Sequence, residues 1–201
     1  MFFIVMLIAF CHSSALGMEL KIESYKECKA AQEKVCAAAK NGIFLQALVH
    51  TESILSKIDS KKLNSWTHFT LQAGAFAYLS HQIFRSKEHL EALYSKQFDP
   101  SSHLEFKKVK AGYYLAQIAL DANNLHQAFE YLSAASQISL ISKKRKEFYI
   151  TVMNDLAELY KLRNDLLNAC SCYENITRLA EEFPHDAAGA QIDLKRLENI
   201  L

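Results

Sequence analysis

The sequence predicts an all-α fold built from paired helices that are joined by short turns. Three observations indicate this: only five glycines and two prolines in 201 residues, apolar residues spaced three and four apart, and a six-residue pattern that occurs three times. A β-rich fold needs many tight turns, so the scarcity of turn-forming residues favours long helices with short joints. The chain length suits one domain or one short repeat array.

The six-residue pattern predicts where helices meet. It reads GIFLQA at residues 42–47, NNLHQA at 123–128 and NDLLNA at 164–169. Each copy opens with Gly or Asn, which tolerate the left-handed backbone conformation that ends many helices. Each copy closes with Ala, whose small side chain lets two helices approach closely. We therefore expect a helix-turn-helix joint with a close-packing site at each copy.

Residues 1–17 differ in composition from the rest of the chain. They contain no Lys, Arg, Asp or Glu, and residues 2–11 form an uninterrupted apolar run. The run has the length of a signal-peptide core and is shorter than the roughly 20 apolar residues that a transmembrane helix needs. Ala15 and Gly17 predict cleavage before Met18, which leaves a domain of residues 18–201. We therefore expect a secreted, periplasmic or lumenal protein.

Two alternatives remain for the N-terminal segment. Because the usual basic residues at the start of a signal peptide are missing, the run could instead be an apolar helix of a cytoplasmic protein. The chain could also be a lipoprotein with a lipid on Cys11, although Phe10 stands where such signals usually carry a small residue. No later segment reaches transmembrane length, and we expect no stable membrane span.

Cleavage before Met18 would leave four cysteines, Cys28, Cys36, Cys170 and Cys172. In helices, the first two are about 12 Å apart along the axis and the last two point to nearly opposite sides, so neither local pair suits a disulfide. We expect small apolar side chains in helix interfaces, with disulfides between distant cysteines as the alternative. A Cys-x-Cys sequence without nearby His is no zinc pattern, and no metal site is expected.

The first helix pair is expected over residues 22–57, with its joint at Asn41-Gly42. Its first helix carries an apolar stripe of Ala30, Ala31, Val35, Ala38 and Ala39. A long segment and a shorter helix follow, and they fit the repeat least well. Their apolar residues are Trp66, Phe69, Ala73, Phe76, Ala77, Ile83 and Phe84, then Leu90, Leu93 and Tyr94. Asp99-Pro100 ends this second pair, because proline disfavours helical geometry in the residue before it.

The third and fourth pairs are expected over residues 104–139 and 146–182. Ser102 and Glu105 predict a capping box at the start of the third pair. The basic stretch 143–146 is expected to be a solvated joint, with a phosphate site or nuclear signal as the alternative. Phe183-Pro184 ends the fourth pair. Asp186 is expected to cap a last helix with an apolar edge of Ile192, Leu194, Leu197, Ile200 and Leu201.

The alanines that close the repeated pattern set the repeat length. Ala47, Ala128 and Ala169 are 81 and 41 residues apart, and Ala92 falls between the first two, so four units follow. Together with Leu156-Ala157, Tyr160 and Tyr173, this pattern resembles the tetratricopeptide repeat (TPR) family. The resemblance implies a right-handed superhelix of about four antiparallel helix pairs with a C-terminal capping helix.

The resemblance also implies a concave groove lined by the first helix of each pair. The family's groove positions correspond here to eight residues that would bind a partner peptide or helix. They are Lys110, Tyr113, Gln117 and Asp121 in the third pair, and Thr151, Asn154, Glu158 and Lys161 in the fourth. An ordinary solvated helix face is the alternative.

Composition and motifs argue against several classes of function. A net charge of +1 provides no overall attraction to nucleic acid, and none is expected as a partner. No His-Glu-x-x-His sequence, Gly-rich phosphate loop or Gly-x-Ser-x-Gly elbow occurs, so we expect no catalytic residues, cofactor or metal. The resulting prediction is a non-enzymatic adaptor or scaffold that binds a protein partner. The alternative is a structural subunit or lipoprotein of an envelope assembly.

Overall fold

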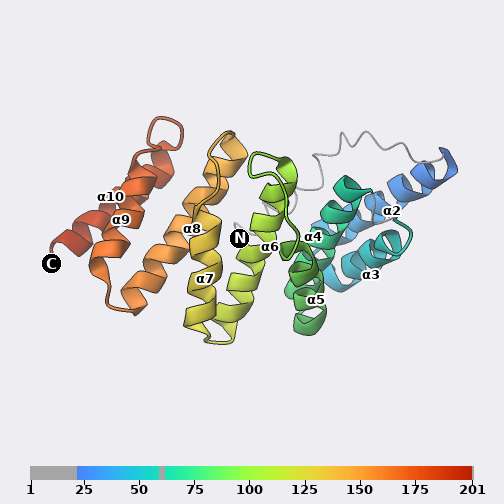
Figure 1. Ribbon diagram of the computed structural model, residues 1–201, viewed down its shortest axis with the longest axis horizontal. Helices are drawn as coiled ribbons and strands as arrows, with labels where there is room; N and C mark the ends of the chain where they lie inside the picture. Colours follow the sequence, from blue (N-terminus) through green and yellow to red (C-terminus); the bar gives the residue numbers. More distant parts are fainter. Residues whose placement is uncertain (1–21, 59–61, 201) are drawn as a thin grey trace. The chain divides into compact units, whose positions relative to one another are not determined.

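The computed structural model describes residues 22–58 and 62–200, and every regular element within them is an α-helix (Figure 1). The predicted signal segment, residues 1–17, and the lipidation candidate Cys11 lie outside the described residues. The helices are α2 (Ile22–Lys40), α3 (Phe44–Leu55), α4 (Leu63–Leu79), α5 (Ile83–Tyr94), α6 (His103–Asp121), α7 (Leu125–Ser136), α8 (Lys143–Leu162), α9 (Leu166–Thr177) and α10 (Pro184–Glu198). The all-α prediction is therefore confirmed for the described residues.

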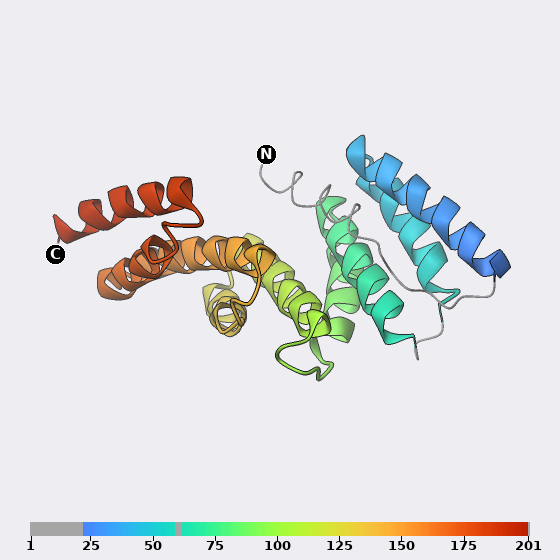
Figure 2. The same ribbon diagram turned by 90° about the horizontal axis from the view of Figure 1, so that it is seen from above.

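The chain divides into two compact units. Unit 1 ends at Phe98 and contains α2 to α5, while unit 2 begins at Asp99 and contains α6 to α10. Consecutive helices pack against each other within each unit, and Figure 2 shows α2 and α3 running side by side. Each unit thus contains two antiparallel helix pairs, and α10 follows the last pair by packing on α9.

Four joints share one backbone conformation. A residue with positive φ ends the first helix of every pair: Gly42 (73°), His81 (60°), Asn123 (55°) and Asn164 (58°). The sequence pattern predicted three of these residues, and the structure confirms them. His81 was missed because histidine is a less common left-handed residue than Gly or Asn.

The hydrogen bonds at the joints explain why a left-handed residue is needed there. At the fourth joint the Asn164 amide donates to the carbonyl of Lys161 at 3.0 Å, and the Asp165 amide donates to that of Tyr160 at 2.8 Å. The other three joints contain the same two bonds at the corresponding positions. This is the Schellman arrangement, which satisfies the last carbonyl groups of a helix. The joints are therefore local structures determined by a few residues.

The second helix of every pair has 12 residues. The residue before each of these helices adopts nearly the same conformation, with φ between −97° and −88°. In unit 2 the Asn124 and Asp165 side chains accept hydrogen bonds from the amides of Gln127 and Asn168, as N-cap residues do. The recurrence of joint, cap and helix length defines a repeated helix pair.

The predicted packing alanines are correct in three pairs and wrong in one. Ala47, Ala128 and Ala169 are completely buried, as expected for residues at a close helix contact. In the second pair Ala92 is exposed, and Ser86 takes the anchor position with no exposed surface. Its hydroxyl donates to the carbonyl of Gly74 at 2.8 Å, so a polar side chain fits there because it finds a backbone acceptor.

Gly74 lies at a tight contact between α4 and α5. A Cβ atom added to Gly74 would meet Leu90 Cδ2 at 2.5 Å, whereas one added to Gly189 in α10 would meet no atom within 4 Å. Overpacking costs about 1–3 kcal/mol and the higher helix propensity of alanine offsets about 1 kcal/mol. We therefore expect Gly74→Ala to lower the free energy of unfolding by about 1 kcal/mol and Gly189→Ala to raise it by about 0.5–1 kcal/mol. Urea unfolding followed by circular dichroism measures the free energy of unfolding of both variants. If both substitutions changed it in the same direction, the tight contact between Gly74 and Leu90 would be wrong.

The core of unit 1 lies between α2, α3 and α4. Its buried residues are Val35, Ala38, Ala39, Ala47, Leu48, Ile54, Phe69, Ala73, Phe76 and Ala77. Most of the predicted apolar stripes are therefore correct, although Ala30 is exposed and the side chain of Ala31 lies outside the described part. The assignment of Ile83 and Phe84 to the long helix of the second pair was wrong, because α4 ends at Leu79 and both residues begin α5. Phe84 is 92% exposed, since it occupies the outer side of that first turn.

The ends of unit 2 also differ in part from expectation. The Ser102 hydroxyl accepts from the Glu105 amide at 3.1 Å, which confirms the N-cap of α6. The last helix was expected to be capped by Asp186, but α10 begins at Pro184, whose fixed φ suits a first helical position. Asp186 lies in the first turn instead. Of the expected apolar edge, Leu194 and Leu197 are buried, Ile192 and Ile200 are exposed, and residue 201 is outside the described part.

Candidate functional site

The eight predicted partner-binding residues lie on α6 and α8, the first helices of the two pairs in unit 2. Side chains connect these helices directly. The Gln117 side-chain amide donates to Asp155 Oδ2 at 2.8 Å, and the rings of Tyr113 and Phe148 meet edge to face with their centroids 5.4 Å apart. Part of the predicted surface is therefore used to join α6 to α8.

The four residues on α6 differ in how much surface they offer. Tyr113 is 5% exposed, Lys110 and Gln117 are half-buried, and Asp121 is exposed. The buried Tyr113 ring packs on Phe148, so it contributes to the helix contact rather than to an open surface. Of these four residues, Asp121 offers the most surface to a partner.

The four residues on α8 offer more surface. Asn154 and Glu158 are exposed, and Thr151 and Lys161 are half-buried. Glu158 Oε1 accepts hydrogen bonds from Lys161 Nζ at 2.7 Å and from the Tyr173 hydroxyl at 3.0 Å. A carboxylate held by two donors loses less conformational freedom on binding. Glu158 is therefore a pre-positioned acceptor on an accessible face.

Asp155 is a polar residue of this region that the sequence analysis did not assign to the site. Burial raises the pKa of its carboxyl group, hydrogen bonds from Tyr113 and Gln117 oppose that shift, and the charge of Glu158 adds to it. The signal available in the sequence was the position of Asp155 next to the apolar Leu156, because an acid at the edge of an apolar helix face needs hydrogen-bond donors.

The basic stretch 143–146 was expected to be a solvated joint, and this is wrong for Arg145. The stretch forms the first turn of α8, where Arg145 is only 4% exposed. Its Nη2 donates to the carbonyl groups of Ser101 at 3.0 Å and Ser102 at 2.6 Å. Arg145 is buried because its planar guanidinium group reaches two carbonyl groups at the start of α6. Lys143 and Lys144 are exposed, as expected.

Lys110 lies in an unusual electrostatic environment. Its Nζ lies 4.6 Å from the ring centroid of Phe106 and 5.7 Å from that of Phe148. The pKa of Lys110 is lowered to about 7, mainly by burial and also by the charge of Lys144, while the charge of Glu147 acts in the opposite direction. The ammonium group therefore gains and loses its proton near neutral pH.

This pKa predicts a pH-dependent effect of Lys110→Met. Unfolding returns the pKa from about 7 to 10.5, so between these values the unfolded chain binds more protons and stability rises with pH. Below about pH 7 Lys110 is charged in both the folded and the unfolded chain, so burying its charge lowers stability by the full amount. This loss of stability becomes smaller as the pH rises. We expect Lys110→Met to be more stable than the wild type at pH 6.5, with the difference shrinking toward pH 10. Urea unfolding across this range measures it, and a pH-independent difference would contradict the prediction.

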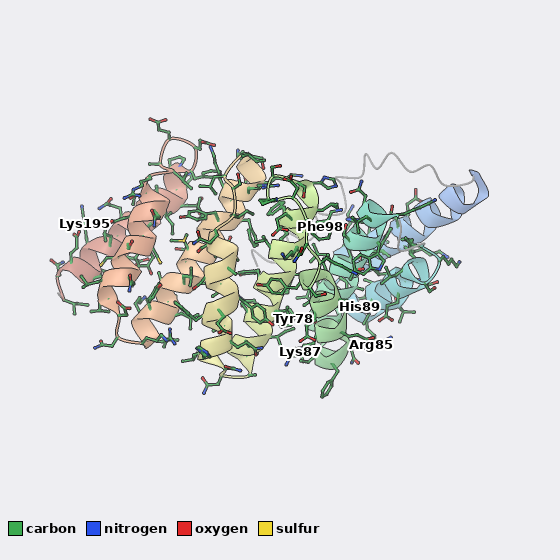
Figure 3. All side chains as sticks on the ribbon, viewed as in Figure 1. Tyr78, Arg85, Lys87, His89, Phe98 and Lys195 are labelled. Carbon is green, nitrogen blue, oxygen red and sulfur yellow. The ribbon has the colours of Figure 1, made fainter. Side chains whose placement is uncertain are left out.

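A separate charged cluster connects α3 and α5 in unit 1. Glu52 on α3 pairs with Arg85 at 2.6 Å and with His89 at 3.0 Å, and Figure 3 labels the two α5 residues. These contacts cross between helices and hold α5 against α3. Within residues 22–58 and 62–200, no group of three or more His, Cys, Asp or Glu side chains is placed to hold a metal ion.

The cysteines that the structure describes are free thiols. Cys170 and Cys172 are buried and Cys36 is half-buried. Burial and, to a smaller extent, the charge of Asp165 raise the pKa of Cys172 to about 11, so its thiol is protonated at neutral pH. These residues serve as small packing groups in α2 and α9. Cys28 was also a candidate, but its side chain lies outside the described part.

Comparisons with known proteins do not assign this chain to a family. No protein-family model, no curated protein and no solved structure matches it. Among the helices that the structure describes, none combines the length and the apolar character needed to cross a membrane. The resemblance to the TPR family therefore stays a prediction that depends on the repeated joints and their packing residues.

Proposed function

We propose that this protein is a non-enzymatic adaptor or scaffold whose helix pairs form a right-handed TPR-like superhelix and bind a protein partner. The observation that carries the proposal is the joint, which recurs four times with the same backbone conformation and hydrogen bonds. Helix pairs of this kind bury their apolar faces against neighbouring pairs, and such stacking creates extended surfaces suited to peptides or helices.

The partner would bind across the first helices of unit 2. Asn154 and Glu158 on α8 and Asp121 on α6 supply exposed polar groups. Glu158 keeps its orientation through Lys161 and Tyr173, so it offers a defined acceptor for a backbone amide or a basic side chain. A peptide or helix with a positively charged residue fits this surface better than an acidic one.

Site-specific photo-crosslinking in the native host tests this surface. A photoreactive amino acid replaces Asn154 on α8 or, as a matched control, the exposed Glu130 on α7. We expect position 154 alone to crosslink to one polypeptide, and Glu158→Lys to abolish the product by reversing a charge next to it. Equal crosslinking at both positions, or a product unchanged by Glu158→Lys, would refute the proposed surface.

We also propose export from the cytoplasm after cleavage before Met18. The intact mass of the protein from its own host, measured with and without reductant, tests this directly. A chain that begins at Met18 supports a secreted, periplasmic or lumenal adaptor. A lipid-sized mass increment on Cys11 would instead identify a lipoprotein of an envelope assembly, and a full-length chain would indicate a cytoplasmic protein.

A further inference from the structure

Three kinds of side-chain contact join α6 and its start to α8 in unit 2. They are Arg145 with the carbonyl groups of Ser101 and Ser102, Phe148 with Tyr113, and Asp155 with Gln117. Arginine keeps its charge at any pH that the protein meets, and the aromatic contact carries no charge. The contact of Asp155 is therefore the one of the three that acidification can change.

Asp155 is half-buried and accepts hydrogen bonds from two side chains of α6. Gln117 Nε2 donates to its Oδ2 at 2.8 Å, and the Tyr113 hydroxyl also donates to the carboxyl group. Both donors favour the charged form, but burial outweighs them and raises the pKa of Asp155. The charged residues before and after these donors on α6 are Lys110, whose Nζ lies over aromatic rings, and the exposed Asp121.

Glu158 is the charged neighbour of Asp155 on α8. It follows Asp155 by three residues, the spacing at which helical side chains are neighbours, and its charge raises the pKa of Asp155 further. Lys161 Nζ bonds to Glu158 Oε1, and so does the Tyr173 hydroxyl of α9. The charged residues of α7 and α9, the helices that pack on α8, are exposed: they are His126, Glu130 and Glu174.

A proton on Asp155 would change both of its contacts. It removes the repulsion by Glu158, and it replaces a charge-assisted hydrogen bond from Gln117 with a weaker neutral one. Because the pKa of Asp155 is raised on folding, the folded chain binds this proton more tightly than the unfolded chain, and stability falls as the pH rises through this range. The ionised form is therefore the less stable one, but it carries one more negative charge beside Glu158.

We propose that Asp155 is a pH-sensitive contact between α6 and α8 that lowers the affinity of the partner surface for a basic partner when it gains a proton. The inference rests on the proposed function, because Asp155 lies between Asn154 and Glu158 of that surface. With Asp155 ionised, two carboxylates one turn apart attract a basic side chain, and with Asp155 protonated only Glu158 does. A bound cation in turn favours the charged form of Asp155, so partner binding and proton release are linked.

NMR titration of the carboxyl carbons in the isotope-labelled full chain tests the contact without a partner. We expect Asp155 to titrate with a midpoint above 3.8, the ordinary value for aspartate. Glu158→Gln should lower this midpoint because it removes a neighbouring negative charge, and Gln117→Leu should raise it because it removes a donor to the carboxylate. The exposed Glu181, in the turn after α9, supplies the matched control Glu181→Gln, which should leave the midpoint unchanged.

Glu158 is exposed, so Glu158→Gln tests the contact even if Gln117→Leu fails to fold. A midpoint of Asp155 at or below 3.8, or a midpoint that Glu158→Gln does not lower, would overturn the contact.

Photo-crosslinking from position 154 in an extract of the native host tests the effect on the partner. The yield is compared at neutral pH and at about one pH unit below the midpoint measured for Asp155. We expect the wild-type yield to fall about two- to five-fold on acidification, which corresponds to the loss of one exposed ion pair. Asp155→Asn should give the low yield at both pH values, because asparagine is uncharged at either, and Glu181→Gln should behave like the wild type.

The two proposals fail in different ways. A crosslinking yield that falls equally with pH in the wild type and in Asp155→Asn would overturn the role of Asp155 and leave the proposed adaptor function standing. If no product forms from position 154 at any pH, the partner surface is wrong, and the role of Asp155 in binding is wrong with it.

Discussion

Replacing Ala169 with phenylalanine is expected to lower the free energy of unfolding by about 1–3 kcal/mol. Ala169 is completely buried at the start of α9, one helical turn after the joint at Asn164. Ala157 and Ile176 of the same pair are completely buried as well, so a large ring at position 169 has to displace closely packed side chains. Chemical unfolding followed by circular dichroism measures the loss.

A matched change separates overpacking from the general effect of an aromatic residue in a helix. Ala134 lies in α7, a second helix of the same length, but is exposed. Ala134→Phe should therefore change stability by no more than about 0.5 kcal/mol. If Ala169→Phe unfolded at the same denaturant concentration as the wild type, the close packing of the fourth pair would be wrong.

Arg145→Met is expected to destabilise the protein by about 1.5–3 kcal/mol, the range for hydrogen bonds that involve a charged group. Methionine keeps an apolar side chain beside Phe106 but removes the donor for the carbonyl groups of Ser101 and Ser102. Removing the positive charge of Arg145 also removes its repulsion of protonated His103, which offsets a small part of the lost stability. Urea unfolding at neutral pH and moderate salt is the appropriate measurement.

Two controls define the role of Arg145. Arg145→Lys keeps the charge but lacks the planar fork, and we expect it to recover less than half of the lost stability. Lys144→Met changes the neighbouring exposed residue and should stay within about 0.5 kcal/mol of the wild type. Full recovery in Arg145→Lys would show that charge, rather than hydrogen-bond geometry, explains the burial of Arg145.

The candidate site was only partly predictable from the sequence. The resemblance to the TPR family placed all eight groove candidates on the helices α6 and α8, but it did not reveal how deeply each side chain is buried. Tyr113 is buried because α8 supplies Phe148, and Gln117 is engaged because α8 supplies Asp155, which is 38 residues away in the chain. No local pattern encodes such a pairing, since each helix alone could present either residue to solvent.

What the sequence by itself determined is the set of helices and three of the four joints. A Schellman joint needs hydrogen bonds between residues at most five positions apart, so Gly42, Asn123 and Asn164 were sufficient to predict it. Only the tertiary structure decided which lysine or arginine of the stretch 143–146 turns inward. The acceptors of Arg145 lie 43 and 44 residues earlier, and they reach it only when α6 and α8 pack.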